Sequence, residues 1–178
     1  ASEALHSGAW KKLMGRDLAG TPVLIVGYGR IGRRVAEMLR AFKARVLVSD
    51  PYVDTAALRA EEQLVSLEEG LAAASIVSIH AAGAETILGA EQLNLLQEGA
   101  LVLNCSRGSM IEEAALIAAL ENGKVGAAWI DVYDREPYEG PLLKYDQVLL
   151  TPHMSGYSRQ CRVAMETEAA ENLLRDMG

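Results

Sequence analysis

The chain has 178 residues, of which 50% are hydrophobic and 23% are charged, and its formal net charge is -7. This length and composition are ordinary for one globular domain with a buried core, and they exclude a disordered chain. The acidic balance provides no basic surface for nucleic-acid phosphates or anionic lipids, so we expect a small-molecule or protein partner, with no nucleic acid and no membrane.

Targeting signals and cysteine usage favour a soluble, cytoplasmic protein. No apolar run approaches the roughly 20 residues that span a bilayer, and the N-terminus has neither a charged nor an apolar signal region. Two cysteines, Cys105 and Cys161, do not make a disulfide framework and suit a reducing compartment. The chain opens at Ala1, which fits an excised fragment, although removal of a methionine before alanine leaves the same end.

Strand-like and helix-like segments alternate along the chain. Residues 1–15 are predicted to form a linking helix that ends near Gly15. The apolar runs predict strands at Val23–Val26, Arg45–Ser49, Ile76–His80, Ala100–Cys105, Val125–Ile130 and Val148–Thr151. Helices are predicted at Arg30–Phe42, Ser66–Ala73, Ala90–Leu96, Ile111–Asn122 and Ser158–Met177. Because each crossover between parallel strands needs a covering helix, this alternation predicts an α/β fold of Rossmann type. Its doubly wound parallel sheet has helices on both faces, in three α/β/α layers, and residues 1–178 form a single domain.

Residues at the predicted helix ends support these assignments, with one exception. Ser66 is a suitable N-cap, with Glu69 in the first turn, and Asn122-Gly123 can adopt the left-handed conformation that ends a helix. Lys43 stands where a glycine is expected between the first long helix and the next strand, which predicts a strained or differently shaped cap.

The segment from Val23 to Asp50 carries a dinucleotide-binding pattern. Gly27 permits a tight turn after the strand, Gly29 lets the backbone approach a pyrophosphate, and Gly32 lets the following helix pack closely on the strand. The helix then directs its unpaired N–H groups at the phosphates. Asp50 ends the second strand at the offset where a carboxylate binds a ribose diol, and it would repel a 2′-phosphate. The pattern therefore predicts NAD rather than NADP, and we expect no metal.

Polar residues gather directly after the later strands, where open α/β sheets place their ligands. Arg107 follows the strand that begins at Ala100, Glu136 follows the strand that begins at Val125, and His153 follows the last strand. A guanidinium can bind the carboxylate and carbonyl of a 2-keto acid with two parallel hydrogen bonds. An imidazole beside a carboxylate can supply a proton to the developing alkoxide. These three residues therefore predict a hydride-transfer site.

In these motifs the chain resembles the D-isomer-specific 2-hydroxyacid dehydrogenases. The resemblance covers essentially all 178 residues. It is carried by GAW at 8–10, GYGRIG at 27–32, SDP at 49–51, VSIH at 77–80, NCSRG at 104–108, DVYDREP at 131–137, PLL at 141–143 and TPHMSG at 151–156.

The resemblance implies roles for particular residues. Arg107 would orient the substrate, His153 would be the acid/base, and Glu136 would pair with it. Asp131 would lie near the nicotinamide carboxamide. Arg30 and Ile31 would offer groups to the pyrophosphate, and His80, Cys105 and Gly156 would line the cofactor crevice. The resemblance also implies a homodimer, because relatives pair through this domain.

Two departures from the family pattern matter. The loop after His80 reads AAGAETILGAEQ, without the Pro-Leu-Thr-like start that is usual there, which puts the loop geometry over the cofactor in doubt. Family members also carry a substrate domain, built largely from residues before this segment, and a short tail after it. We therefore expect the NAD-binding domain alone, with little or no turnover as an isolated chain.

Two other functions remain open at this stage. One is an NAD-sensing protein-interaction domain, since the family's fold also serves in the C-terminal-binding-protein corepressors. The other is an assembly module that binds no nucleotide.

Overall fold

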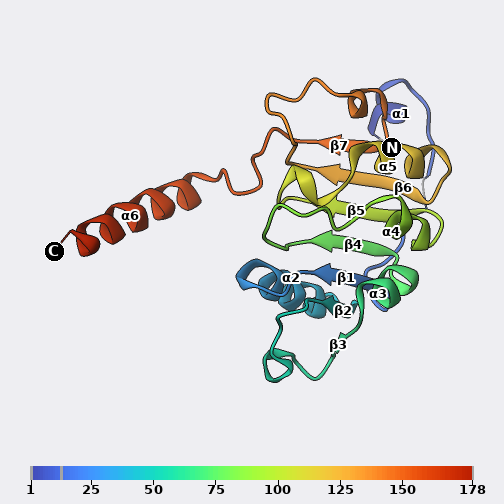
Figure 1. Cartoon of the computed structure of the whole chain (residues 1–178). Coiled ribbons are helices and arrows are strands. Elements are labelled where there is room, and N and C mark those ends of the chain that lie inside the picture. Colours follow the sequence, from blue (N-terminus) through green and yellow to red (C-terminus); the bar gives the residue numbers. More distant parts are fainter. Residues whose placement is uncertain (1, 13, 178) are drawn as a thin grey trace.

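The computed structural model describes residues 2–12 and 14–177, and within them it contains a seven-stranded sheet (Figure 1). The strands are β1 (Pro22–Val26), β2 (Arg45–Ser49), β3 (Glu62–Leu64), β4 (Ile76–Ile79), β5 (Ala100–Asn104), β6 (Val125–Ile130) and β7 (Val148–Leu150). The α-helices are α1 (Ser2–His6), α2 (Arg30–Ala41), α3 (Leu67–Ala73), α4 (Ala90–Leu95), α5 (Glu113–Glu121) and α6 (Arg159–Asp176). Short 3-10 helices are η1 (Thr55–Ala57), η2 (Gly108–Met110) and η3 (Pro141–Lys144).

All neighbouring strands pair in parallel, in the order β3-β2-β1-β4-β5-β6-β7. The chain enters the sheet at β1, runs outward through β2 and β3, and then returns to place β4 on the other side of β1. This reversal is the position at which open α/β sheets bind ligands, at the carboxyl ends of the strands. The predicted doubly wound α/β fold is therefore confirmed, and β3 is an additional edge strand that the polar sequence Glu62-Gln63-Leu64 concealed.

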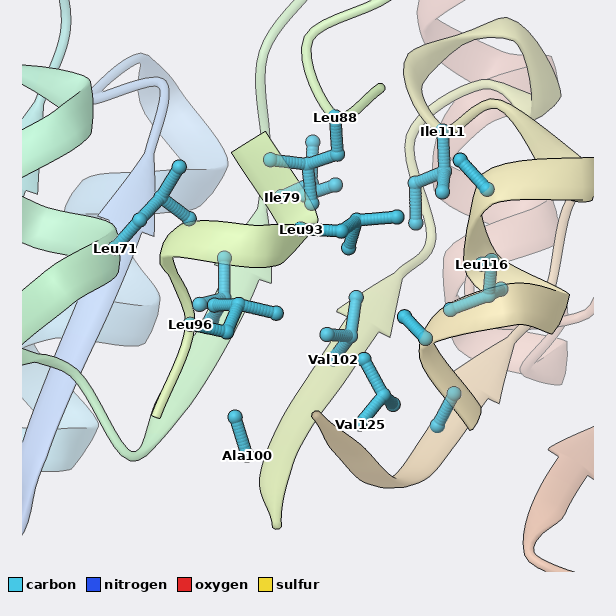
Figure 2. Packing of buried hydrophobic residues seen from close by; sticks show 14 of the residues in the cluster. Leu71, Ile79, Leu88, Leu93, Leu96, Ala100, Val102, Ile111, Leu116 and Val125 are labelled. Carbon is cyan, nitrogen blue, oxygen red and sulfur yellow. The ribbon is translucent and has the colours of Figure 1, made fainter. Parts of the chain in front are cut away.

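Helices α3, α4 and α5 cover one face of the sheet. Figure 2 shows Leu71, Leu93 and Leu116, one from each helix, among strand residues such as Ile79 and Val102, and all five are fully buried. Burial of each such side chain contributes about 1.5–3 kcal/mol relative to leaving it in water. This face holds the main core of the domain.

The opposite face is covered only at its β1–β2 end, where α2 packs. The core there consists of Val23, Ile25, Tyr28, Ala36, Val46 and Val48. The strand register places Leu101 and Leu149 on the same face, farther along the sheet, and both are exposed. Helices do lie on both faces, as predicted, but the α2 layer is short over the described part of the chain.

The predicted helix over residues 1–15 is wrong beyond its first turns. Helix α1 ends at His6, and Gly8 follows with a φ of 81°. The described residues from there to Gly15 are irregular, and Ala1 and Leu13 of the predicted helix lie outside the described residues. Trp10 is 83% exposed, and Met14 is exposed as well. Without a surface to pack against, a short helix has little to stabilise it.

The predicted irregular cap at Lys43 is confirmed. Helix α2 ends at Ala41, and Lys43 adopts a φ of 59°, while its N–H donates to the carbonyl of Arg40 at 2.8 Å. Lysine pays a steric cost in this left-handed region that glycine would avoid. The predicted caps at Ser66 and at Asn122-Gly123 are also present.

Helix α6 projects away from the sheet (Figure 1). Ser158 caps its N-terminus by accepting a hydrogen bond from the Cys161 N–H at 3.1 Å, and Arg162 pairs with Glu166. None of its residues is buried, so it contributes nothing to the core. Over the described residues, no helix combines the length and the hydropathy that crossing a membrane requires.

Candidate functional site

The glycine turn joins β1 to α2 in a tightly packed space. Gly27 has a φ of 90°, and a Cβ placed on it would lie 2.5 Å from the backbone nitrogen of Ala81. A Cβ on Gly32 would overlap the carbonyl oxygen of Gly27. A Cβ on Gly29, by contrast, would meet no protein atom within 4 Å. Packing therefore requires the first and third glycines, whereas the second faces open space through which a ligand can approach.

The N-terminus of α2 follows directly from this turn. Gly29 is its N-cap and contributes no side-chain hydrogen bond, and the first turn contains no acidic residue. The first backbone N–H groups of a helix have no partner within the helix, and together with the helix dipole they favour an anion. Arg30 and Ile31 are exposed at this position. The turn and helix thus form an anion-binding end.

Asp50 lies directly after β2 and is held by two backbone N–H groups. Its Oδ2 accepts a hydrogen bond from the Tyr28 N–H at 2.6 Å, and its Oδ1 accepts one from the Tyr52 N–H at 2.8 Å. Each carboxylate oxygen retains a further lone pair for a hydroxyl donor. The carboxylate is therefore oriented before any ligand arrives.

His80 and Cys105 lie at the ends of β4 and β5, and both favour their neutral forms. The His80 ring Nε2 lies 2.9 Å from the Ser78 hydroxyl, and burial lowers the pKa of His80. Burial, followed by the negative charge of Asp131, raises the pKa of the Cys105 thiol. Both side chains are half-buried, so they offer an uncharged surface at the strand ends.

Arg107 is carried by a loop that Asn104 organises. The Asn104 Nδ2 donates to the Arg107 carbonyl at 2.9 Å, and the Ser106 hydroxyl donates to the Ile79 carbonyl of β4 at 2.7 Å. The Arg107 side chain is exposed, and its Nη1 donates to the Ser106 carbonyl at 2.7 Å. Within residues 2–12 and 14–177, no hydrogen bond or ion pair joins Arg107 to the residues after β6 and β7.

Glu136 and His153 are brought together. The Glu136 Oε2 lies 3.1 Å from the His153 Nδ1, and Glu136 Oε1 accepts a hydrogen bond from the Tyr133 N–H at 3.2 Å. The bond to His153, and then the bond from Tyr133, lower the pKa of Glu136. The His153 side chain is 54% exposed. With Nδ1 engaged by Glu136, Nε2 is the ring nitrogen left for another partner.

Asp131 anchors the loop that carries His153. It is 0% exposed and accepts hydrogen bonds from the Thr151 hydroxyl at 2.5 Å, the Met154 N–H at 2.9 Å and the Ser155 N–H at 2.8 Å. Burial alone would raise the pKa of Asp131, but these hydrogen bonds outweigh burial and lower it. His153 lies between the anchored residues with a φ of 49°. The carboxylate therefore holds a backbone conformation that is unfavourable for a histidine.

Thr151 and Trp129 complete this anchor, and the sequence analysis missed both. The Trp129 indole N–H donates to the Thr151 hydroxyl at 2.9 Å, and Thr151 in turn donates to Asp131. A hydroxyl residue directly after an apolar strand is the one signal that pointed to Thr151. Nothing local identified Trp129, because its partner lies 22 positions away. Gly156, also predicted to line the site, lies exposed beyond this loop.

Two hollows flank the stacked rings of Tyr133 and Tyr138, whose centroids are 4.3 Å apart. One, of about 430 Å³, lies against α5 and includes Asn104. The other, of about 610 Å³, includes Glu136 and Leu143. Neither is lined by the glycine turn. Over the described part of the chain, no group of three His, Cys, Asp or Glu side chains is placed to hold a metal ion.

These features are typical of a dinucleotide-binding α/β domain. They are the parallel sheet that reverses direction beside β1, the glycine turn that leads into α2, and the oriented carboxylate of Asp50 after β2. Residues 1–155 match the family model described as D-isomer specific 2-hydroxyacid dehydrogenase, NAD binding domain. The chain belongs to this family, of which it represents the NAD-binding domain.

Individual relatives agree with this assignment. The chain is 36% identical over 184 residues to D-3-phosphoglycerate dehydrogenase of Archaeoglobus fulgidus, covering 98% of this chain and 34% of that protein. It is also similar to a glyoxylate reductase structure from Paecilomyes thermophila, with a TM-score of 0.87, 32% identity, and coverage of 97% and 54%. A 2-hydroxyacid dehydrogenase from Xanthobacter autotrophicus, determined with NADPH, has a TM-score of 0.78, 30% identity, and coverage of 86% and 50%. The chain thus spans a third to a half of these proteins.

Proposed function

We propose that this chain is the NAD-binding domain of an enzyme that interconverts D-2-hydroxy acids and 2-keto acids, and that the isolated domain turns over slowly or not at all. The observation that carries the proposal is the Glu136–His153 pair, which lies at the same carboxyl end of the sheet as the glycine turn. Glu136 follows β6, which lies between β7, the strand before His153, and β5, the strand before Arg107. Because the chain spans only part of its relatives, the complete reaction belongs to the whole protein.

The cofactor residues fit a dinucleotide in this arrangement. The open space above Gly29 and the unpaired N–H groups of Arg30 and Ile31 suit a pyrophosphate, while Asp50 suits a ribose diol. Gly27 and Gly32 permit the close packing that forms this cradle. On the other side, His80, Cys105, Asp131 and Gly156 would border the nicotinamide half.

The catalytic residues divide the work on the substrate. When bound, the oxidised cofactor NAD would accept a hydride from the hydroxy acid, and the reduced cofactor NADH would donate one to the keto acid. Arg107 binds and orients the substrate carboxylate through its planar guanidinium. The Nε2 of His153 donates a proton to the carbonyl oxygen of the keto acid. In the reverse direction the same nitrogen accepts the proton of the hydroxyl group. Glu136 holds the imidazole through Nδ1 and so orients Nε2 toward the substrate.

Asp50 should favour NAD over NADP, since its carboxylate would repel a 2′-phosphate. A structural relative was determined with NADPH, so family membership alone leaves this preference open. We also propose a homodimer, a cytoplasmic location and a small 2-hydroxy or 2-keto acid as substrate. The relatives and structures compared give no support to the NAD-sensing corepressor alternative.

Calorimetry with NAD and with NADP tests the cofactor part of the proposal. Binding of NAD, weaker binding of NADP, and loss of this difference in Asp50→Ala are the expected results. No NAD binding at millimolar concentration would also favour the remaining alternative of an assembly module. The reaction itself requires the complete protein, assayed with NADH and a panel of 2-keto acids.

A further inference from the structure

Glu62 is a buried carboxylate on the edge strand β3, and it contacts the glycine turn, the loop before β3 and helix α2. Its side chain is 0% exposed. Its Oε2 accepts hydrogen bonds from the Tyr28 hydroxyl and from the Arg59 N–H, the latter at 2.9 Å. Its Oε1 lies 3.3 Å from the Arg40 Nε in α2, an ion pair without hydrogen-bond geometry. A buried charge is costly unless it is paired, so this arrangement needs a reason.

Tyr28 connects this carboxylate to the cofactor turn. It lies between Gly27 and Gly29, and its ring is buried in the core beneath α2. Burial, and then the bond to Glu62, raise the pKa of Tyr28 to about 12, so the hydroxyl stays protonated and donates. The backbone N–H of the same residue donates to Asp50 at 2.6 Å. One residue therefore bonds to Glu62 through its side chain and to Asp50 through its backbone.

We propose that Tyr28 and Glu62 are positioning residues for the adenosine-side ribose: their bond fixes the middle of the glycine turn, so that the Tyr28 N–H holds the Asp50 carboxylate ready for the ribose hydroxyls. The inference rests on the proposed placement of the cofactor at Asp50. Arg40 belongs to the same network, because it connects Glu62 to the helix whose N-terminus faces the pyrophosphate.

The test uses Tyr28→Phe in the 178-residue chain, with calorimetric dissociation constants for NAD and NADP. We expect NAD affinity to fall about tenfold, equivalent to about 1.4 kcal/mol. NADP affinity should change much less, because a 2′-phosphate gains nothing from an oriented Asp50. The ratio of the two dissociation constants is the decisive readout, since a general loosening of the fold would weaken the binding of NAD and of NADP to the same extent.

Two further variants separate positioning from stability. Glu62→Gln keeps an acceptor for the Tyr28 hydroxyl and should bind NAD within about twofold of the unaltered chain, whereas Glu62→Leu should resemble Tyr28→Phe. The matched control is Tyr145→Phe, which removes a surface bond between Tyr145 and Glu121 and should leave both constants unchanged.

The outcomes distinguish this inference from the proposed function. If Tyr28→Phe lowers the melting temperature but leaves the NAD-to-NADP ratio unchanged, the bond only stabilises the fold and the inference is wrong. If Asp50→Ala weakens NAD binding while Tyr28→Phe does not, the inference alone fails. If Asp50→Ala has no effect on NAD binding, the proposed cofactor placement fails, and the inference fails with it.

Discussion

The glycine turn with Asp50, and the segments after β5, β6 and β7 that carry Arg107, Glu136 and His153, lie at the same end of one sheet. The fold holds these two regions in different ways. At the turn, Asp50 is fixed by two backbone N–H groups and Tyr28 is buried against Glu62. After β5, β6 and β7, Arg107 is exposed, and the exposed His153 bonds through its ring Nδ1 to Glu136, which is also exposed. The groups at the glycine turn are thus held by the fold itself, whereas the side chains of Arg107, Glu136 and His153 lie exposed.

This difference indicates how the two halves of the function depend on the rest of the protein. A site with oriented groups can bind its ligand without further ordering. A catalytic pair that is half in water gains electrostatic strength only when water is excluded. We therefore expect this chain to bind NAD, and we expect catalysis to need further residues that exclude water from the Glu136–His153 pair.

The largest expected effect is at His153. In the complete protein, His153→Ala should lower kcat by about 10²–10⁴-fold, because the proton donor is lost. The 178-residue variant should bind NAD as before, since the His153 side chain is exposed and bonds to Glu136 rather than to the glycine turn. Steady-state assays with NADH and a 2-keto acid, together with calorimetry, measure both. Unchanged turnover would remove His153 from the mechanism.

Glycine substitutions compare packing with ligand approach. Gly32→Ala should lower the free energy of unfolding by about 3 kcal/mol, because the new Cβ collides with the Gly27 carbonyl. Gly29→Ala meets no protein atom and should cost only about 1 kcal/mol of stability, because alanine is a poorer N-cap than glycine, yet it should weaken NAD binding. Urea unfolding and calorimetry check the pair. Equal stability of the two variants would contradict the packing argument.

The Asp131 anchor should be worth about 2 kcal/mol, which is typical of hydrogen bonds to a buried charge. Asp131→Asn replaces one carboxylate oxygen with an NH2 donor, which then faces either the Met154 N–H or the Ser155 N–H, because these two groups bond to different oxygens. Thermal and urea unfolding should show the loss. Asp134→Asn, on the exposed part of the same loop, is the control. Similar stability of these two variants would mean that the anchor is dispensable.

The smallest effect is the pH dependence of the Glu136–His153 pair. The pKa of Glu136 is lowered in the folded state, so the stabilisation is fully present above the ordinary glutamate pKa and is lost as the pH falls through the lowered value. Carboxyl carbon NMR should place the Glu136 midpoint below 4.5, the ordinary value, and His153→Ala should move it upward. A midpoint that ignores the substitution would show that the pair does not form in solution.

Much of the fold follows from local pattern. The alternation of apolar strands with helical spacing predicted the parallel sheet, and Gly27 and Gly32 marked the tight turn between β1 and α2. Pattern failed where packing decides. The 1–15 helix was overestimated because Trp10, which would have anchored it, is exposed, and β3 was missed because a glutamate such as Glu62 is typical of a surface position.

By itself, the sequence determined the class of fold, the cofactor turn and the types of residue at the strand ends, because these depend on short-range periodicity and on what glycine alone permits. Only the tertiary structure decided which polar groups meet. Tyr28 and Glu62 are separated by 34 positions, and Asp131 is separated from Met154 by 23. The first bond joins the turn after β1 to strand β3, and the second joins the segments after β6 and β7, so the geometry of both is set by the sheet register and the close packing of the core rather than by any local preference.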